Sequence, residues 1–383
     1  MNRIVVHALG LYQIFAWGST YYLMAVLAVP IVEDTGWPLE WVVGSLSLGL
    51  LAAGIISPRV GDAIARYGGR PVLVIGSVVM ASALLLLAAA PNLPVFMVGW
   101  IVLGTGMGAG LYDATFSTLG RIHGVKARAS ITTLTLWGGF ASTVCWPLSA
   151  FFVETIGWRG ACMAYAAILI VICMPLLLAF VPRVPRSGGA GSSRASAKPV
   201  LTSEERTRFR LFASIQILAG LFVTIVSVHL LTLLQARGVT LGEAVALGAL
   251  IGPAQVGARV LEMLGRSRHH PLWTLTAAVS LCAAGLVLLA SGIGLLGTAL
   301  VLYGAGNGIF SIARGALPLA LFGPERYASL MGRLARPGLI AQAAAPLVGA
   351  ALISRFGPEA TLQFAAMLGL ANIALVVVLW IKR

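Results

Sequence analysis

The chain has 383 residues, of which 59% are hydrophobic and only 10% are charged, and its formal net charge is +14. Soluble globular domains carry about 25% charged residues, so this composition excludes the ordinary water-soluble classes. Apolar runs of about twenty residues or more, the length that crosses a bilayer core, recur along the whole chain. The sequence therefore predicts an integral membrane protein.

Long apolar segments without strict alternation predict transmembrane α-helices rather than barrel strands. In chain order, the first six predicted spans lie near residues 5–31, 39–65, 71–90, 93–120, 126–155 and 158–182. The other six lie near residues 209–236, 240–265, 271–292, 294–320, 326–354 and 358–381. The first span is too long and too polar for a cleaved signal peptide, so we expect it to be retained. The expected fold is an all-α membrane protein with about twelve transmembrane helices.

The most conspicuous linker lies at residues 183–207 and is rich in Gly, Ser, Ala and Arg without apolar periodicity. Such a composition predicts a flexible segment, here a cytoplasmic connection between two groups of six spans. We therefore expect an N-terminal bundle at 1–182 and a C-terminal bundle at 208–383.

An internal repeat relates the two halves at an offset of about 200 residues. Residues 102–108 read VLGTGMG and residues 302–308 read LYGAGNG, so that Gly104, Gly106 and Gly108 match Gly304, Gly306 and Gly308. Further along, Pro147 matches Pro346 and Gly157 matches Gly357. Repeats of this kind are typical of secondary transporters. They predict two similar bundles about an approximate twofold axis along the membrane normal, with the glycines acting mainly as packing positions.

The positive charge is distributed unevenly along the chain. One set of loops holds most of the bases: Arg66, Arg70, Arg121, Lys126, Arg128, the linker arginines, Arg266, Arg268, Lys382 and Arg383. The opposite loops hold mainly acids: Glu33, Asp34, Glu40, Glu154, Glu243 and Glu359. This is the positive-inside pattern, which predicts that both termini lie in the cytoplasm. We interpret the charge as a topology signal, not as a nucleic-acid surface, and expect a location in the bacterial inner (plasma) membrane.

The segment SPRVGDAIARYGGRPVLVIG, residues 57–76, resembles the loop motif between the second and third helices of the major facilitator superfamily. The glycine and basic positions of that pattern are occupied by Gly61, Arg66, Gly68, Arg70 and Pro71. The resemblance implies a cytoplasmic gate at this loop and transport by rocking of the two halves about a midplane site. The segments TGMGAGLYD, GVKARAS and ETIGWRGA further resemble the monocarboxylate-transporter-like and oxalate/formate-like branch.

The chain departs from the family pattern at several positions. Ala65 replaces the usual acid of the loop motif, and Asp62 lies one turn earlier. Arg59 and Asp62 have the i,i+3 spacing of a helical ion pair, so we expect them to pair at the gate. Trp100 occupies the place where many proton-coupled members have an arginine, and the fifth span lacks the full glycine-proline motif of drug antiporters.

Charges inside the predicted spans are the sharpest chemical signal. The second half embeds Arg259, Arg314, Arg333 and Arg336 against a single acid, Glu262. An arginine at mid-bilayer costs roughly 2.5–3.5 kcal/mol, so embedded arginines indicate function. At about 1.5 Å per residue, Arg336 lies about 13–15 Å and Arg314 about 10 Å from the cytoplasmic helix ends. In the first half, Asp113 is the one acid of comparable depth.

Two interpretations of these arginines stay open. They brace the cytoplasmic side by pairing with Asp62, Asp113 and Glu262, or their surplus charge binds an anionic substrate. We favour bracing for Arg259 and Arg333 and substrate binding for Arg314 and Arg336. Asp113 is expected to be a proton carrier, a gate partner of Arg314, or both. Further candidate substrate contacts are Tyr12, Gln13 and Tyr21 in the first span, Gln216 in the seventh and Asn307 in the tenth.

No nucleotide-binding loop, metal-ligand cluster or nucleophile–base arrangement is found in the sequence, so we expect neither an enzyme nor a cofactor. The predicted function is secondary active transport by a monomer in the lipid bilayer, most simply of a small organic anion, with protons as a coupling ion. One alternative is proton-antiport efflux of drug-like or toxic compounds, including metalloids. An alternative of another class is a transporter-like membrane sensor.

Overall fold

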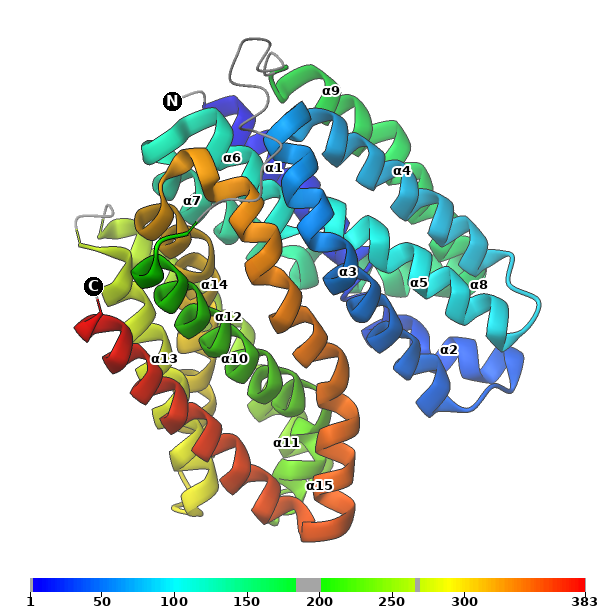
Figure 1. Ribbon diagram of the computed structural model, residues 1–383. Coiled ribbons are helices and arrows are strands. Elements are labelled where there is room, and N and C mark those ends of the chain that lie inside the picture. The colour runs from blue at the N-terminus through cyan, green and yellow to red at the C-terminus, as the bar shows by residue number, and fades with distance from the viewer. Residues whose placement is uncertain (1–2, 184–200, 266–268, 383) are drawn as a thin grey trace. The chain divides into compact units, whose positions relative to one another are not determined.

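A computed structural model describes residues 3–183, 201–265 and 269–382, in which helices are joined by short turns and no strand occurs (Figure 1). Its first helices are α1 (Arg3–Gly18), α2 (Met24–Thr35), α3 (Leu39–Tyr67), α4 (Gly69–Ala88), α5 (Leu93–Gly110), α6 (Tyr112–His123), α7 (Ala127–Gly139), α8 (Ala141–Ile168) and, after a π-helical turn, α9 (Met174–Phe180). The later helices are α10 (Ser203–Gln235), α11 (Leu241–Gly248), α12 (Ile251–Leu264), α13 (Pro271–Ser291), α14 (Leu296–Phe322) and α15 (Pro324–Ile381).

Within these residues, 8 helical segments are long and apolar enough to cross a membrane. Two of the segments, Leu93–Phe180 with 88 residues and α15 with 58, are too long for one crossing. The positive-φ residues Gly124 and Gly157 divide the first of these segments into three parts, and Gly357 divides α15 into two. With these breaks, and with α1 and α2 as one interrupted crossing, the helices accommodate the twelve predicted spans. The predicted all-α membrane fold is confirmed.

The chain forms two compact units. Unit 1 comprises Met1–Val200 and Phe322–Arg336, and unit 2 comprises Leu201–Leu321 and Pro337–Arg383. In unit 1, α5 packs against α3 and α4, and α1 packs against α7 and α8 (Figure 1). The first part of α15 therefore packs with unit 1, although it follows the tenth predicted span. The bundle boundaries and the twofold axis inferred from the repeat stay predictions.

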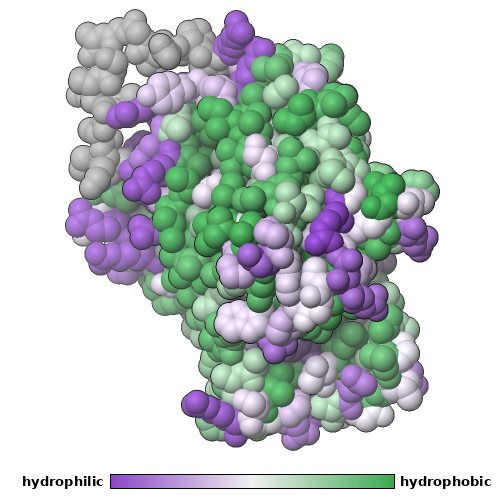
Figure 2. Space-filling model, turned by 90° about the vertical axis from the view of Figure 1, so that its right-hand side faces the viewer, coloured by the Kyte–Doolittle hydropathy of each residue, from purple (hydrophilic) through white to green (hydrophobic). Residues whose placement is uncertain are grey.

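Large apolar side chains lie open on the surface. The face in Figure 2 is hydrophobic over broad areas, and Val171 in the π-helical turn is 70% exposed. In water such surface would be unfavourable, whereas a lipid bilayer solvates it at no cost. The exposed apolar surface is what a membrane-embedded chain requires.

The first glycine of each repeated triplet packs backbone against backbone. A Cβ atom at Gly104 would lie 2.0 Å from the carbonyl oxygen of Gly49 on α3, and one at Gly304 would lie 2.8 Å from that of Ile251 on α12. The other triplet positions are equally closed against neighbouring helices: Gly106, Gly108, Gly306 and Gly308. The predicted packing role of these glycines is confirmed.

The repeat also extends to backbone conformation. Gly157 has φ 72° and ψ 170°, and Gly357 has φ 86° and ψ 168°. Positive φ favours glycine because a Cβ atom is strained there. The two residues thus make the same kind of turn at equivalent places in the sequence.

The end of the predicted linker needs a correction. Residues 203–207 belong to a helix, because α10 begins at Ser203. The Thr202 hydroxyl accepts from the Glu205 amide, and the Glu205 carboxylate accepts from the Thr202 amide, at 3.2 and 3.0 Å. This capping box stabilises the first turn of the helix and was readable in the sequence as Thr-x-x-Glu. Residues 184–200 of the linker lie outside the described part of the chain.

Candidate functional site

In unit 1, the candidate site is built around a break in the fourth predicted span. Between α5 and α6, Leu111 is extended with φ −79° and ψ −165°. Such a break leaves backbone groups without helical partners. The Gln13 side chain satisfies part of this need, because its Nε2 atom donates to the Gly110 carbonyl and to the Thr115 hydroxyl, both at 2.8 Å. Gln13 therefore links α1 to the break.

The candidate substrate contacts predicted in the first span differ in their exposure. Tyr12 and Gln13 are both 0% exposed, so neither reaches a solute in this conformation. Tyr12 also lies at the break, since a Cβ atom at Gly110 would be 2.4 Å from its hydroxyl oxygen. These two residues thus support the interrupted helix. Tyr21, in contrast, is half-buried.

Tyr21 belongs to an aromatic cluster beside the break. Its ring centroid lies 5.5 Å from that of Trp17, and Trp17 lies 5.0 Å from Tyr112. Trp17 is held in place because its indole N–H donates to Gln13 Oε1 at 3.0 Å. We define the aromatic cluster as Trp17, Tyr21, Tyr22, Tyr112, Phe116 and Trp146. Of these six, Tyr21 was among the candidate substrate contacts, and adjacency to the embedded Asp113 could have drawn attention to Tyr112.

Asp113 lies in the first turn of α6, directly after the break, and its side chain is half-buried. The partial positive charge of a helix N-terminus stabilises a carboxylate at such a position. Asp113 also lies within electrostatic reach of the buried Tyr327 in the same unit. The structure therefore gives this acid a specific setting, and its role in proton coupling stays a prediction.

An ion pair joins α3 to the first part of α15 within unit 1. Arg333 Nη1 lies 3.0 Å from Asp62 Oδ1, and Arg333 Nη2 lies 3.2 Å from Asp62 Oδ2. The Ser329 hydroxyl also donates to Asp62 Oδ1, and its carbonyl accepts from Arg333 at 2.9 Å. Arg333 thus pairs with one of the three acids named in the bracing interpretation. The expected Arg59–Asp62 pair is wrong, because Arg59 is exposed and bonds to no residue that the structure describes.

Two glycines bring these charged residues together. A Cβ atom at Gly61 would lie 2.5 Å from the Ala328 carbonyl oxygen, and one at Gly332 would lie 2.2 Å from that of Ser57. The Ser57 hydroxyl donates to the Gly332 carbonyl at 2.9 Å. This close backbone contact brings Asp62 within reach of the Arg333 side chain, although the two residues are far apart in the sequence.

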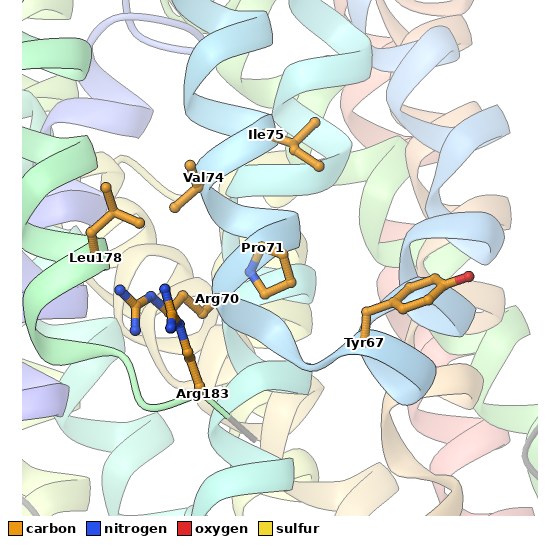
Figure 3. A pocket seen from close by; sticks show the side chains of 7 residues that line it. All are labelled: Tyr67, Arg70, Pro71, Val74, Ile75, Leu178 and Arg183. Atoms are coloured by element: carbon orange, nitrogen blue, oxygen red, sulfur yellow. The ribbon is translucent and has the colours of Figure 1, made fainter. Parts of the chain in front are cut away.

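The loop motif also has a substitute for its missing acid. Arg121 on α6 donates to the backbone carbonyl of Ala65, the residue that replaces the acid. A carbonyl thus serves as acceptor where the family pattern has a carboxylate. Of the other motif arginines, Arg66 is exposed and Arg70 lines a cavity (Figure 3).

In unit 2, polar residues form a stripe along α14. Asn307, Ser311 and Arg314 are spaced by four and three residues, which places them on one helix face. All three are half-buried. On α10, Gln216 is 4% exposed, and its Nε2 atom has no hydrogen-bond partner within the described residues. Buried polar groups normally find partners, so Gln216 remains a candidate ligand group.

Arg259 and Glu262 of α12 connect to neighbouring helices of unit 2. Arg259 is 6% exposed, and its Nε atom donates to the carbonyl of Gly308 at 3.1 Å. Glu262 accepts from the Thr274 hydroxyl at 2.8 Å and lies 3.2 Å from Nε2 of His269. These contacts are structural links between helices, in keeping with the bracing that we favour for Arg259.

Arg336, the last residue of unit 1, has a different environment. It is exposed and forms no hydrogen bond or ion pair with the residues that the structure describes. No group of three His, Cys, Asp or Glu side chains suited to a metal ion occurs in the described ranges. The predicted role of Arg336 as a ligand group stays a prediction.

Comparison with known proteins identifies the class. Residues 9–333 match the family model of the Major Facilitator Superfamily. The chain belongs to this family of transporters and is an integral, multi-pass membrane protein. The fold and family expected from the loop motif are confirmed.

Particular relatives share part of their sequence with the chain. Monocarboxylate transporter 11 of Homo sapiens is 28% identical over 242 residues, which span 60% of this chain and 47% of the relative. Monocarboxylate transporter 3 of Rattus norvegicus is 24% identical over 336 residues, which span 83% of this chain and 65% of the relative. The chain thus spans less than two thirds of the length of these relatives.

Solved structures agree with the fold over the whole chain. The human organic anion transporter MFSD10 superposes with a TM-score of 0.77 at 16% identity, covering 98% of this chain and 99% of the other. FucP, a Major Facilitator Superfamily transporter solved in the outward conformation, gives 0.75 at 15% identity, covering 97% and 98%. At these identities the likeness establishes the fold alone.

Proposed function

We propose that this transporter carries a small organic anion and that Asp113 couples the transport to protons. The observation that carries the proposal is the polar stripe on α14, which holds Arg314 on the same face as Asn307 and Ser311. An arginine in a membrane span is costly unless it serves pairing or ligand binding. Its planar guanidinium can hold a carboxylate by two parallel hydrogen bonds.

Within unit 1, the aromatic cluster offers a contact surface for apolar groups of a solute. Trp17, Tyr21 and Tyr112 are half-buried and provide large rigid rings for contact. Rings of this kind bind flat or apolar groups with little loss of side-chain entropy. The names of human monocarboxylate transporter 11 and of the human organic anion transporter MFSD10 support the same substrate class.

The same cluster favours a second candidate, efflux of drug-like compounds by proton antiport. Tryptophan and tyrosine rings attract cations as well as apolar groups. The two candidates differ in the charge of the substrate. An organic anion needs Arg314, whereas a cation would be repelled by it.

Counterflow into liposomes containing the purified protein tests the proposal. Labelled benzoate, lactate and the cation ethidium are compared for wild type, Arg314→Lys, Arg314→Gln and the control Arg355→Gln, an exposed arginine of the same unit. We expect anion uptake to fall about tenfold in Arg314→Lys, which retains charge without the fork, and further in Arg314→Gln. Selective ethidium transport, or anion uptake that is equal in all four proteins, would contradict it.

We further propose that the chain lies in a bacterial plasma membrane as a monomer with both termini in the cytoplasm. The excess of bases in one set of loops supports the orientation. Labelling of single cysteines introduced at exposed loop residues, such as Lys126→Cys and Glu40→Cys, tests the orientation. Only the first should react from the cytoplasmic side of sealed inverted vesicles.

A further inference from the structure

A cavity of about 450 Å³ lies in unit 1 where the turn from α3 to α4 approaches the end of α9 (Figure 3). Two arginines, Arg70 and Arg183, provide its charge. Its apolar wall consists of Pro71, Val74, Ile75 and Leu178, and Tyr67 lies at its edge. Neither the Asp62–Arg333 ion pair nor the aromatic cluster includes any of these residues.

The two arginines are an unusual pair. Figure 3 shows their guanidinium groups directed into the same space. Neither forms a hydrogen bond or ion pair with any residue in the described part of the chain. Like charges that face each other repel, and an anion between them would replace this repulsion with attraction. The charge of the cavity therefore calls for an anionic ligand.

The order of the residues along the helices indicates that the ligand also has an apolar part. Arg70 is the second residue of α4, and Val74 and Ile75 follow it by four and five residues. At about 1.5 Å per residue they lie about 6–8 Å further along the helix. On the other wall, Leu178 lies within α9 and Arg183 lies beyond its end. Both walls are thus charged at the helix end and apolar towards the span.

The apolar wall is open to the outside of the protein. Ile75 is 60% exposed and Leu178 is 39% exposed. Tyr67 is 49% exposed at the level of the helix ends, the usual position of an aromatic anchor at a membrane interface. A soluble anion would use only the arginines, whereas an amphiphile would use both parts of the cavity.

We propose that this cavity binds an anionic phospholipid. The phosphodiester lies between Arg70 and Arg183, whose guanidinium forks suit phosphate oxygens, and an acyl chain runs along Val74, Ile75 and Leu178. Basic pockets between helices at the cytoplasmic side of membrane proteins bind lipid headgroups in this way. The bound lipid would join the α3–α4 turn to the end of α9. The proposal is independent of the transported substrate.

Native mass spectrometry of the purified protein with phosphatidylglycerol or phosphatidylcholine tests the site. The variants are Arg70→Gln, Arg183→Gln and their combination. The control is Lys126→Gln, which removes an exposed base of the same unit that has no bonding partner within the described residues. We expect wild type and control to retain phosphatidylglycerol preferentially, and the double variant to bind it about tenfold more weakly. Phosphatidylcholine binding should be the same in all of them.

A competition experiment distinguishes binding of a lipid from binding of a free phosphate. Glycerol phosphate carries the same anionic group without acyl chains, so it should displace phosphatidylglycerol poorly. Equal competition by glycerol phosphate, or equal phosphatidylglycerol binding in wild type and double variant, would overturn the proposal. The combined Arg70→Lys and Arg183→Lys variant keeps the charge and should lie between wild type and the glutamine variant. Elution as a single species in gel filtration checks that each variant is folded.

Discussion

Asp62 of α3 and Arg333 of α15 form a two-pronged ion pair, with N–O distances of 3.0 and 3.2 Å. The pair lies within unit 1, although α15 continues into unit 2 from Pro337 onward. Asp62 stands one turn before the position where the loop motif usually has its acid. We propose that the pair forms the cytoplasmic gate expected from that motif, and that its breaking frees the first part of α15 from α3.

Removal of either charge should loosen this gate. The side chains of Asp62 and Arg333 are 45% and 25% exposed. Solvent screening therefore limits the stabilisation by the ion pair to about 1 kcal/mol. A cysteine introduced by Ala328→Cys, a position 2% exposed beside Gly61, should react about fivefold faster with a maleimide when Asp62→Asn or Arg333→Gln is added. The exchanged pair, Asp62→Arg with Arg333→Asp, should restore protection.

Arg59→Gln is the matched control for this gate, because Arg59 lies on the same helix and is exposed. It should leave the reaction rate unchanged. An equal acceleration by Arg59→Gln, or none by Asp62→Asn, would mean that the ion pair does not hold the segment.

Gly104→Ala and Gly304→Ala should destabilise the protein. The added methyl groups would meet backbone oxygen atoms at 2.0 and 2.8 Å, and a backbone carbonyl cannot move aside as a flexible side chain can. We expect losses of about 1–3 kcal/mol, larger for Gly104, measured by thermal unfolding in detergent. Gly44→Ala should be neutral, since a Cβ atom there meets no atom within 4 Å. Equal melting temperatures for all three variants would disprove the requirement for close packing.

His123 should make stability depend on pH. It ends α6 with Nδ1 2.8 Å from the Ser130 hydroxyl, and burial lowers its pKa below the ordinary 6.5. The unfolded chain then binds the proton more strongly than the folded chain does. The contribution of His123 to the free energy of unfolding is therefore complete above about pH 6.5 and is lost as the pH falls through the lowered pKa. His123→Asn should reduce the fall in melting temperature between about pH 7.5 and pH 5. An equal fall in the melting temperatures of wild type and His123→Asn would show that His123 does not cause the pH dependence.

Asp113→Asn should uncouple transport from the proton gradient. The substitution keeps the size of the side chain but removes its capacity to carry a proton. In liposomes with an imposed pH gradient, we expect accumulation of the anion to be lost while exchange across the membrane continues. Glu325→Gln, an exposed acid of the same unit, is the control. Unchanged accumulation and pH dependence in Asp113→Asn would assign Asp113 a structural role.

Some features of the unit 1 site were predictable and others were not. Asp113 and Asp62 stood out because charges are rare in apolar spans, and the glycine triplets stood out because they recur. Local spacing suggested Arg59 as the partner of Asp62, but the actual partner is Arg333, 271 positions away. Tyr12 and Gln13 were expected at a substrate surface and are instead buried at the Gly110 break.

The sequence by itself determined the membrane class, the helical spans and the repeat, because the transfer energy and length of a segment depend on its own residues. It also encoded the start of α10, through the capping box at Thr202. Only the tertiary structure decided which buried groups meet, as with Gln13 and Gly110, 97 positions apart. Long-range pairing depends on how helix faces pack, and residue spacing specifies neighbours only within one helix.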